Sequence, residues 1–205
     1  MNSKIMSCKC IVIGVSAGGM EALLKVLPAF PQDFPLPIVI VQHIHKTQSG
    51  IYVEFYNERC ALIAEEAKDK QSLESGKIYF APPNYHLLIE DDETLSLCTS
   101  ERVNYARPSI DVLFESAADV FGEELIGVIL TGANDDGSEG MKQIKQNGGF
   151  TIVQNPKDAE FPAMPQFAID AAEPNLILTL DEMVTEFSVW SKDNKFPKRS
   201  FDEEL

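Results

Sequence analysis

The chain has 205 residues, of which 44% are hydrophobic and 24% charged, so it can bury the core of one folded domain. Its formal net charge of -15 argues against nucleic-acid binding, because sites for the phosphate backbone require clustered lysine and arginine. No apolar run approaches the roughly 20 residues that cross a bilayer, and the N-terminus lacks the apolar segment of a signal peptide, so we expect a cytoplasmic protein without membrane insertion.

Short β-branched segments alternate with longer amphipathic ones through most of the chain. Strands are expected at 10–15, 37–44, 125–132, 150–156 and 174–180, and helices at 18–27, 48–60, 109–122, 138–148 and 181–190. Residues 77–100 interrupt this order, because they form extended segments around the turn-forming EDDET and predict an antiparallel hairpin. The expected fold is therefore α/β, a doubly wound, mostly parallel sheet with helices on both faces and an antiparallel hairpin at one edge.

The chain has no internal repeat and no interior linker, so we expect a single domain over residues 8–190. The charged segment 191–205 is typical of a frayed C-terminal tail. The four cysteines include no C-x-x-C pair, and their spacing predicts neither a zinc site nor a disulfide framework. We expect no metal and no cofactor.

The turn after the first expected strand carries a serine between glycines. Residues 14–18, GVSAG, fit the G-x-S-x-G elbow, in which a tight strand-to-helix bend presents a serine hydroxyl at the carboxyl end of a sheet. The same residues approximate the G-x-G-x-x-G dinucleotide fingerprint, but Ser16 replaces its second glycine and the second strand ends without an acidic residue. A third interpretation is that the glycines only permit a tight bend.

The chain has only three histidines, and a serine hydrolase of the usual kind needs one as its general base. His43 ends the second expected strand, so it and Ser16 can meet at the carboxyl edge of a parallel sheet. His45 follows in a more solvated loop, and His86 in the hairpin is expected to have a surface or packing role. An ordinary α/β-hydrolase is excluded, because its histidine comes last in the chain and its serine follows several strands.

An acidic partner for the histidine is expected at the end of another central strand. The buried run 125–130 leads into a loop that carries Asp135 and Asp136 before the next helix. Acidic residues at this position are commonly helix caps or solvated turn residues, so the residues alone leave the catalytic interpretation open.

Five segments together resemble one known family. IGVSAGGMEAL, VIVQHIHKTQSG, ARPSIDVLFESAA, VILTGANDDGSEGM and TIVQNPKDAEFPAMPQFAI are similar in order to the catalytic domain of the chemotaxis receptor methylesterases, the CheB family. The resemblance covers roughly residues 8–181. It implies a Ser-His-Asp triad that hydrolyses methyl-glutamate esters on chemoreceptor helices and can deamidate glutamines there. Carried over, the nucleophile is Ser16, the base His43 and the orienting acid Asp136.

Backbone N–H groups at the start of the helix after Ser16, those of Ala17 and Gly18, are suited to bind the oxyanion by their position and the helix dipole. The resemblance adds Ala133 and Arg107 to this substrate-binding or oxyanion region, and two roles stay open for Arg107, contact with acidic receptor side chains or pairing with a carboxylate. Two residues of this region depart from other members, because Ala17 stands where some have threonine and Ala133 where some have methionine. Receptor methylation segments are acidic, so the negative net charge of this chain would repel them, and any attraction must come from individual basic side chains. The candidates are Lys46, Arg102 and Arg107.

Only a few residues precede the first expected strand, so we expect a stand-alone form without the receiver domain of the best-known members. The expected partners are a methylated chemoreceptor and, in addition, a methyltransferase or a separate regulatory chain. The alternative function is a non-catalytic interaction module of the same fold that docks on receptors or a methyltransferase. A nucleotide-binding protein is a third, disfavoured hypothesis.

Overall fold

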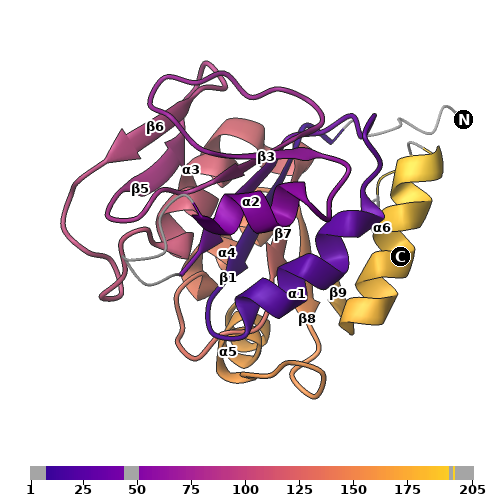
Figure 1. Cartoon of the computed structure of the whole chain (residues 1–205). Coiled ribbons are helices and arrows are strands. Elements are labelled where there is room, and N and C mark those ends of the chain that lie inside the picture. Colours follow the sequence, from indigo (N-terminus) through magenta and orange to yellow (C-terminus); the bar gives the residue numbers. More distant parts are fainter. Residues whose placement is uncertain (1–7, 44–50, 194–195, 197–205) are drawn as a thin grey trace, which may run out of the picture.

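The computed structural model describes residues 8–43, 51–193 and 196, and Figure 1 shows their course. Its strands are β1 (Cys10–Val15), β2 (Ile38–Gln42), β3 (Ile63–Glu66), β4 (Lys77–Phe80), β5 (His86–Ile89), β6 (Leu95–Cys98), β7 (Leu125–Ile129), β8 (Phe150–Gln154) and β9 (Leu176–Leu178). Its α-helices are α1 (Gly19–Val26), α2 (Ile51–Asn57), α3 (Ile110–Phe121), α4 (Ser138–Gln146), α5 (Ala163–Ala172) and α6 (Leu180–Asp193).

Seven strands form one sheet in the order β3-β4-β2-β1-β7-β8-β9, and every neighbouring pair is parallel. The order reverses at β1, which pairs with β2 on one side and β7 on the other. A parallel sheet of this kind places the carboxyl ends of its strands at one edge, where a switch in strand order leaves a crevice. The predicted doubly wound fold is confirmed.

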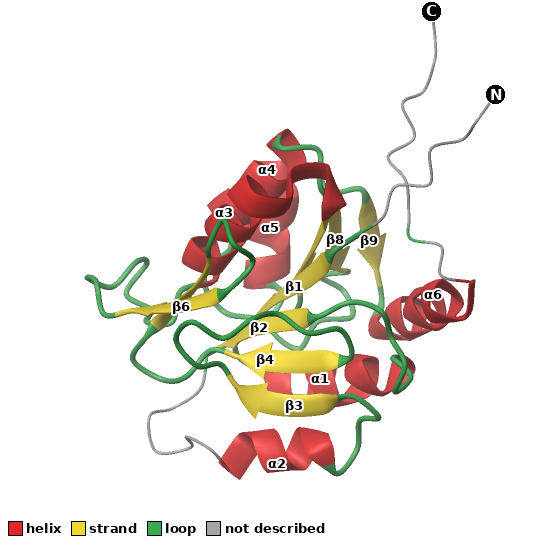
Figure 2. Ribbon diagram, turned by 90° about the horizontal axis from the view of Figure 1, so that it is seen from above, coloured by secondary structure: helices red, strands yellow, loops and turns green. Residues whose placement is uncertain are grey.

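Helices cover both faces of the sheet, with α1, α2 and α6 on one side and α3, α4 and α5 on the other (Figure 2). Alternate residues of β1 serve the two layers. Ile11, Ile13 and Val15 pack with the first set of helices, whereas Cys10 and Val12 pack with the second. Because both faces of the central strands are buried, their sequences are continuous apolar runs rather than alternating ones.

The expected antiparallel hairpin is present as β5 and β6, but it does not extend the edge of the main sheet. It forms a two-stranded sheet of its own that packs on α3, where the Ile89 N–H donates to Ser116 Oγ at 3.1 Å. The preceding extended segment, β4, joins the main sheet instead. Pro82 and Pro83 separate the two, and proline supplies no N–H to continue a ladder.

Two elements were not expected from the sequence. The edge strand β3 has the polar sequence IAEE, which lacks the apolar run of the central strands. Helix α5 contains Pro165, which disfavours a helix except in its first turn, where it lies here. Among the described residues, no helix is both long enough and apolar enough to cross a membrane.

Candidate active site

Three side chains meet at the carboxyl edge of the sheet, each from a different central strand. Ser16 directly follows β1, His43 directly follows β2, and Asp136 lies in the loop after β7. Since β1 is flanked by β2 and β7 and all three run parallel, their carboxyl ends are neighbours. The structure therefore brings together the serine, the histidine and the aspartate that the sequence analysis selected.

The turn that carries Ser16 depends on glycines at two positions. Gly18 has a φ of +74°, a left-handed conformation that favours glycine. At Gly14, a Cβ atom would lie 2.3 Å from the side chain of Ile110, so glycine is needed for α3 to approach β1 closely. The Ser16 N–H donates to the carbonyl of Thr131 at 3.0 Å, which ties the turn to the loop after β7. These contacts leave the Ser16 side chain half-buried at the edge of the sheet.

The imidazole of His43 lies between the other two side chains. Its Nδ1 is 3.2 Å from Ser16 Oγ, and its Nε2 is 2.9 Å from Asp136 Oδ2. For Nδ1 to accept the serine proton, the neutral ring must carry its own proton on Nε2, next to the carboxylate. The Nε2–H direction is not aligned well enough for a hydrogen bond in this structure. Catalytic hydrogen bonds are often poorly aligned in unliganded enzymes and tighten in the complex with substrate.

The Asp136 carboxylate is fully buried at the N-terminus of α3. It accepts hydrogen bonds from Ser109 Oγ at 2.7 Å, the Ile110 N–H at 2.8 Å and the Asp111 N–H at 3.2 Å. Burial opposes its ionisation, but His43 and these donors outweigh that effect and hold the pKa of Asp136 below its ordinary value. Asp136 is therefore a carboxylate beside His43, and it also caps α3.

His86 supports Ser109, one of the residues that bind Asp136, although the sequence predicted only a surface or packing role for this histidine. The ring is completely buried, and its Nδ1 accepts a hydrogen bond from the Ser109 N–H at 3.2 Å. Its Nε2 donates to the carbonyl of Glu101 at 3.0 Å. These two hydrogen bonds hold the His86 ring in place, and the ring in turn fixes Ser109, the residue whose hydroxyl binds Asp136. A serine directly before a helix is a recognisable cap signal, but nothing local indicates that His86 reaches it.

Asp111 forms a second buried carboxylate beside Asp136. Its Oδ2 accepts from Asn104 Nδ2 at 2.7 Å and its Oδ1 from the Gly140 N–H at 2.8 Å. Each aspartate thus caps the helix of the other. Asp111, in the first turn of α3, accepts from an N–H of α4, and Asp136, which precedes α4, accepts from two N–H groups of α3. Burial, together with the charges of Asp136 and Glu115, raises the pKa of Asp111 to about 7, although the bond from Gly140 acts in the opposite direction.

This raised pKa predicts a pH-dependent stability. Between about pH 4 and pH 7 the folded state binds a proton at Asp111 that the unfolded state releases, so the unfolding free energy falls as the pH rises. The shift from 3.8 to about 7 is worth about 1.4 kcal/mol per pKa unit, so the free energy of unfolding lost once the pH has passed 7 is roughly 4 kcal/mol. Asp111→Asn removes the ionisation, and the Asn104 amide can rotate to present its oxygen to the new side chain.

We expect the stability of Asp111→Asn relative to the natural protein to improve between pH 5 and pH 8, as measured by urea unfolding at both values. The other carboxylates titrate in both proteins, so their contributions cancel when one free energy of unfolding is subtracted from the other. A difference that does not change with pH would contradict the raised pKa.

The remaining predicted residues have varied surroundings. Ala133 is exposed and lines an open hollow of about 410 Å³ with Phe161 and Gln166. Arg107 Nη1 donates to the carbonyls of two residues in the loop after β6, at 2.8 and 2.7 Å. Arg102 is exposed. His45 and Lys46 lie outside the described residues.

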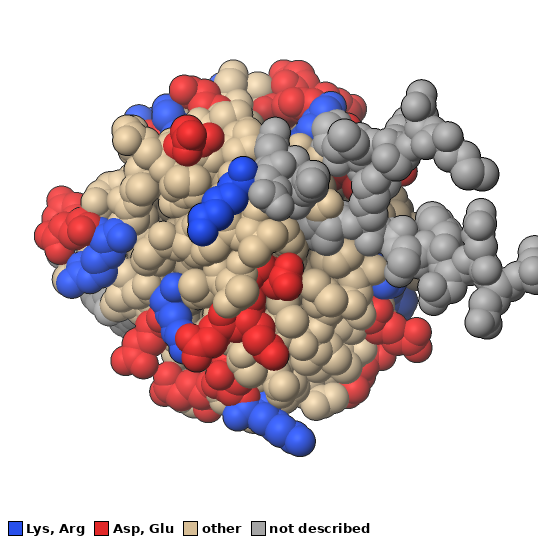
Figure 3. Space-filling view, turned by 90° about the vertical axis from the view of Figure 1, so that its right-hand side faces the viewer, with Lys and Arg blue, Asp and Glu red and all other residues tan. Residues whose placement is uncertain are grey.

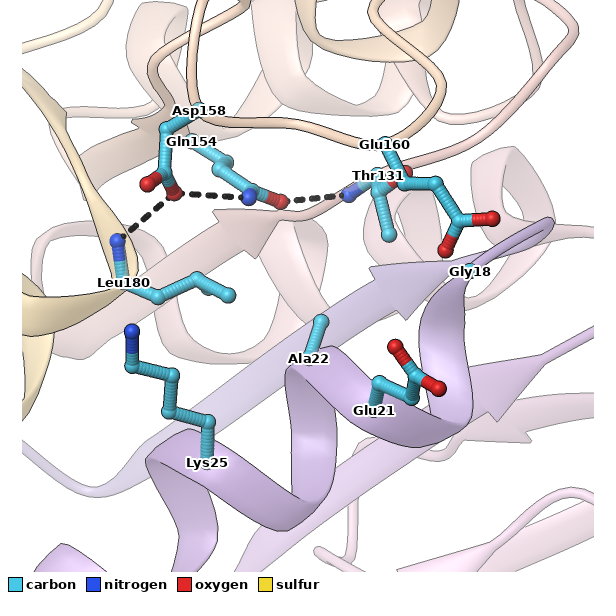
Figure 4. Close-up of a pocket in the computed structure, with 9 residues that line it drawn as sticks. All are labelled: Gly18, Glu21, Ala22, Lys25, Thr131, Gln154, Asp158, Glu160 and Leu180. Atoms are coloured by element: carbon cyan, nitrogen blue, oxygen red, sulfur yellow. Dashed lines mark hydrogen bonds between the residues drawn. The ribbon is translucent and has the colours of Figure 1, made fainter.

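A smaller hollow of about 200 Å³ opens on the α1 side of the serine turn, with Gly18 at one end and Leu180 at the other (Figure 4). A chain of hydrogen bonds runs along one wall. The Leu180 N–H and Gln154 Nε2 both donate to Asp158 Oδ2 at 2.9 Å, and the Thr131 N–H donates to Gln154 Oε1 at 2.8 Å. Among the described residues, no three histidine, cysteine, aspartate or glutamate side chains are grouped so that they could hold a metal ion.

Comparison with known proteins points to one family. The family model described as CheB methylesterase matches residues 11–187. A protein of Leptospira interrogans is 49% identical over 189 residues, which are 92% of this chain and 98% of that protein. The protein-glutamate methylesterase/protein-glutamine glutaminase of Clostridium acetobutylicum is 32% identical over 180 residues, 88% of this chain and 52% of that protein.

A solved structure agrees with the sequence matches. The crystal structure of the Thermotoga maritima CheB methylesterase catalytic domain superimposes with a TM-score of 0.83 and 29% sequence identity. The match covers 87% of this chain and 98% of the other chain.

Proposed function

Because the chain belongs to the CheB methylesterase family, we propose that it hydrolyses methyl esters of glutamate side chains on chemoreceptors, with Ser16, His43 and Asp136 as its catalytic triad. The observation that carries the proposal is the continuous contact from Ser16 Oγ through the His43 ring to Asp136, at 3.2 and 2.9 Å. Neither the dinucleotide-binding nor the purely structural interpretation of the serine turn requires a histidine and a buried carboxylate in line with the hydroxyl.

The chemistry follows from the poor nucleophilicity of a neutral serine hydroxyl. His43 Nδ1 takes the hydroxyl proton as Ser16 Oγ attacks the ester carbonyl, and the imidazolium that forms is stabilised by Asp136. When the tetrahedral intermediate collapses, the ester C–O bond breaks and His43 returns the proton to departing methanol. Water, activated by the same base, then cleaves the acyl-serine and leaves a glutamate side chain.

The oxyanion of the tetrahedral intermediate needs hydrogen-bond donors. The backbone N–H groups of Ala17 and Gly18 are suited to this role because they follow the nucleophile and precede α1, whose N-terminal dipole favours negative charge. Ala133, exposed beside the open hollow, is proposed to border the group that carries the ester. The role of Arg107 in substrate binding stays a prediction.

The same triad can cleave a glutamine side chain, with ammonia in place of methanol as the leaving group. This second activity is favoured by the name of the Clostridium acetobutylicum relative, which includes protein-glutamine glutaminase. Amide hydrolysis needs the same acid, base and oxyanion donors, so no further residue has to be assigned.

An acidic protein repels an acidic receptor segment, so the segment must be attracted by individual basic side chains close to the site. The net charge is -15, and on the face shown in Figure 3 acidic side chains form several clusters, whereas basic ones are scattered. The proposal includes the cytoplasmic location expected from the sequence. It also includes a methyltransferase or a separate regulatory chain as further partners.

The proposal is tested by methanol release from a methyl-esterified chemoreceptor fragment incubated with the purified chain. We expect release at a rate proportional to enzyme concentration, and a Ser16→Ala protein in parallel gives the background. A chain that binds the fragment without releasing methanol above that background would be the non-catalytic module instead. Ammonia release from the fragment with glutamine at the same positions tests the second activity.

A further inference from the structure

In each of the two peptide groups that follow Ser16, the carbonyl is hydrogen-bonded within the protein. The Ser16 carbonyl accepts a hydrogen bond from the Gly19 N–H at 2.9 Å, and the Ala17 carbonyl accepts one from Thr131 Oγ1 at 3.0 Å. A trans peptide group directs its N–H opposite to its carbonyl. Within the described part of the chain, no acceptor is bonded to the N–H of Ala17 or Gly18. Both donors are therefore turned away from the carbonyl contacts and left available to an anion.

The two carbonyl contacts differ in origin. The bond from Gly19 to Ser16 is a local one that forms with the start of α1, whereas the bond from Thr131 to Ala17 joins residues 114 positions apart. The Thr131 side chain is 1% exposed, and its hydroxyl also accepts a hydrogen bond from the Phe161 N–H at 2.9 Å. Two carbonyl oxygens lie within reach of the single hydroxyl proton, that of Ala17 at 3.0 Å and that of Phe161 at 3.4 Å, and the shorter distance assigns the proton to Ala17.

Thr131 is itself held rigidly. Its carbonyl accepts the Ser16 N–H at 3.0 Å, and its own N–H donates to Gln154, which is bonded to Asp158. Figure 4 shows this chain running from the start of α6 to Thr131, beside Gly18. A rigid donor can fix the orientation of a peptide group, whereas a mobile one cannot.

We propose that Thr131 is a positioning residue for the oxyanion hole: its hydroxyl holds the Ala17 carbonyl so that the Gly18 N–H, the opposite end of the same peptide group, is directed at the developing oxyanion. The inference rests on the proposed function, because it presupposes that Ser16 is the nucleophile. Its physical basis is that a donor stabilises the oxyanion best when it is aimed before the reaction begins.

The test compares Thr131→Val with Thr151→Val in a steady-state assay on a small ester, N-acetylglutamate γ-methyl ester. Valine keeps the shape of threonine and removes only the hydroxyl bonds. Thr151 is a matched control, since it is also fully buried and its hydroxyl donates to Asn175 Oδ1 at 2.9 Å and accepts from the Asn175 N–H at 3.1 Å. It lies on β8, outside the proposed site.

Removing an oxyanion donor costs about 10²–10³ in kcat and misdirecting one costs less, so we expect Thr131→Val to lower kcat by about 10–100-fold with KM within about threefold. Thr131→Ser keeps the hydroxyl and should retain kcat within about threefold. Thr151→Val should lower the melting temperature without lowering kcat.

Equal kcat values for Thr131→Val and the natural protein would overturn the positioning role, as would a rise in KM with kcat unchanged. If Thr131→Val does not fold, Thr131→Ser is measured instead. A loss of kcat above about tenfold in Thr131→Ser would also overturn the positioning role, because this variant keeps the hydroxyl. Natural protein that is no faster than Ser16→Ala would instead overturn the proposed function itself.

Discussion

Replacing Ser16 with alanine is expected to lower methyl-ester hydrolysis by about 10⁵–10⁶, to the background of the assay. Without the hydroxyl no acyl-enzyme can form, and the loss of a serine nucleophile in a well-studied protease costs about 2 × 10⁶ in kcat. The fold should be unaffected. The hydroxyl contacts His43, whereas the bonds that shape the turn, from the Ser16 N–H to Thr131 and from Gly19 to the Ser16 carbonyl, are made by the backbone.

The measurement is methanol release from the esterified receptor fragment, accompanied by circular dichroism and a thermal melt. Ser75→Ala is the matched control, because Ser75 is exposed and precedes β4, at the opposite edge of the sheet from the carboxyl ends. A fluorophosphonate probe should label the natural protein and the Ser75 variant but not the Ser16 variant. Folded Ser16→Ala protein that keeps more than about 1% of the activity would show that the nucleophile is another group.

The second large effect is expected for Asp136→Asn, with a fall in kcat of about 10²–10⁴. An amide beside Nε2 no longer stabilises the imidazolium and permits the tautomer with its proton on the nitrogen that faces the serine, and the equivalent change in a serine protease costs about 10⁴. The structure indicates that Asp136→Asn also lowers the free energy of unfolding. Each carboxylate oxygen of Asp136 accepts at least one backbone N–H from Ile110 or Asp111, so in either orientation the amide nitrogen faces a donor. A buried unsatisfied donor costs about 1–3 kcal/mol.

Asp135→Asn is the neighbouring control. Asp135 is exposed in the same loop, and a solvated carboxylate contributes little to a transition state, so its replacement should cost less than about tenfold. Both variants are assayed at several pH values and well below their melting temperatures, which separates the loss of catalysis from the loss of folded protein. A larger loss in Asp135→Asn than in Asp136→Asn would mean that the orienting acid is Asp135.

Local patterns in the sequence determined the α/β architecture and where its chemistry gathers. The apolar runs at 10–15, 37–44 and 125–132 predicted the central strands, because strands buried on both faces are apolar throughout. The residues that follow such strands lie at one edge of a parallel sheet. Ser16, His43 and the loop that carries Asp135 and Asp136 were therefore recognisable as neighbours, and the family resemblance selected Asp136.

Only the tertiary structure decided how these residues are held. The cap that Asp136 places on α3, the support of Ser109 by His86 and the bond from Thr131 to Ala17 join residues between 23 and 114 positions apart. It also decided that β5 and β6 pack on α3 instead of extending the sheet. Propensity and periodicity reflect interactions between residues a few positions apart, whereas a buried hydrogen bond depends on which elements pack together. For that reason the three side chains of the proposed triad could be predicted from the sequence together with the family resemblance, whereas the network that supports them could not.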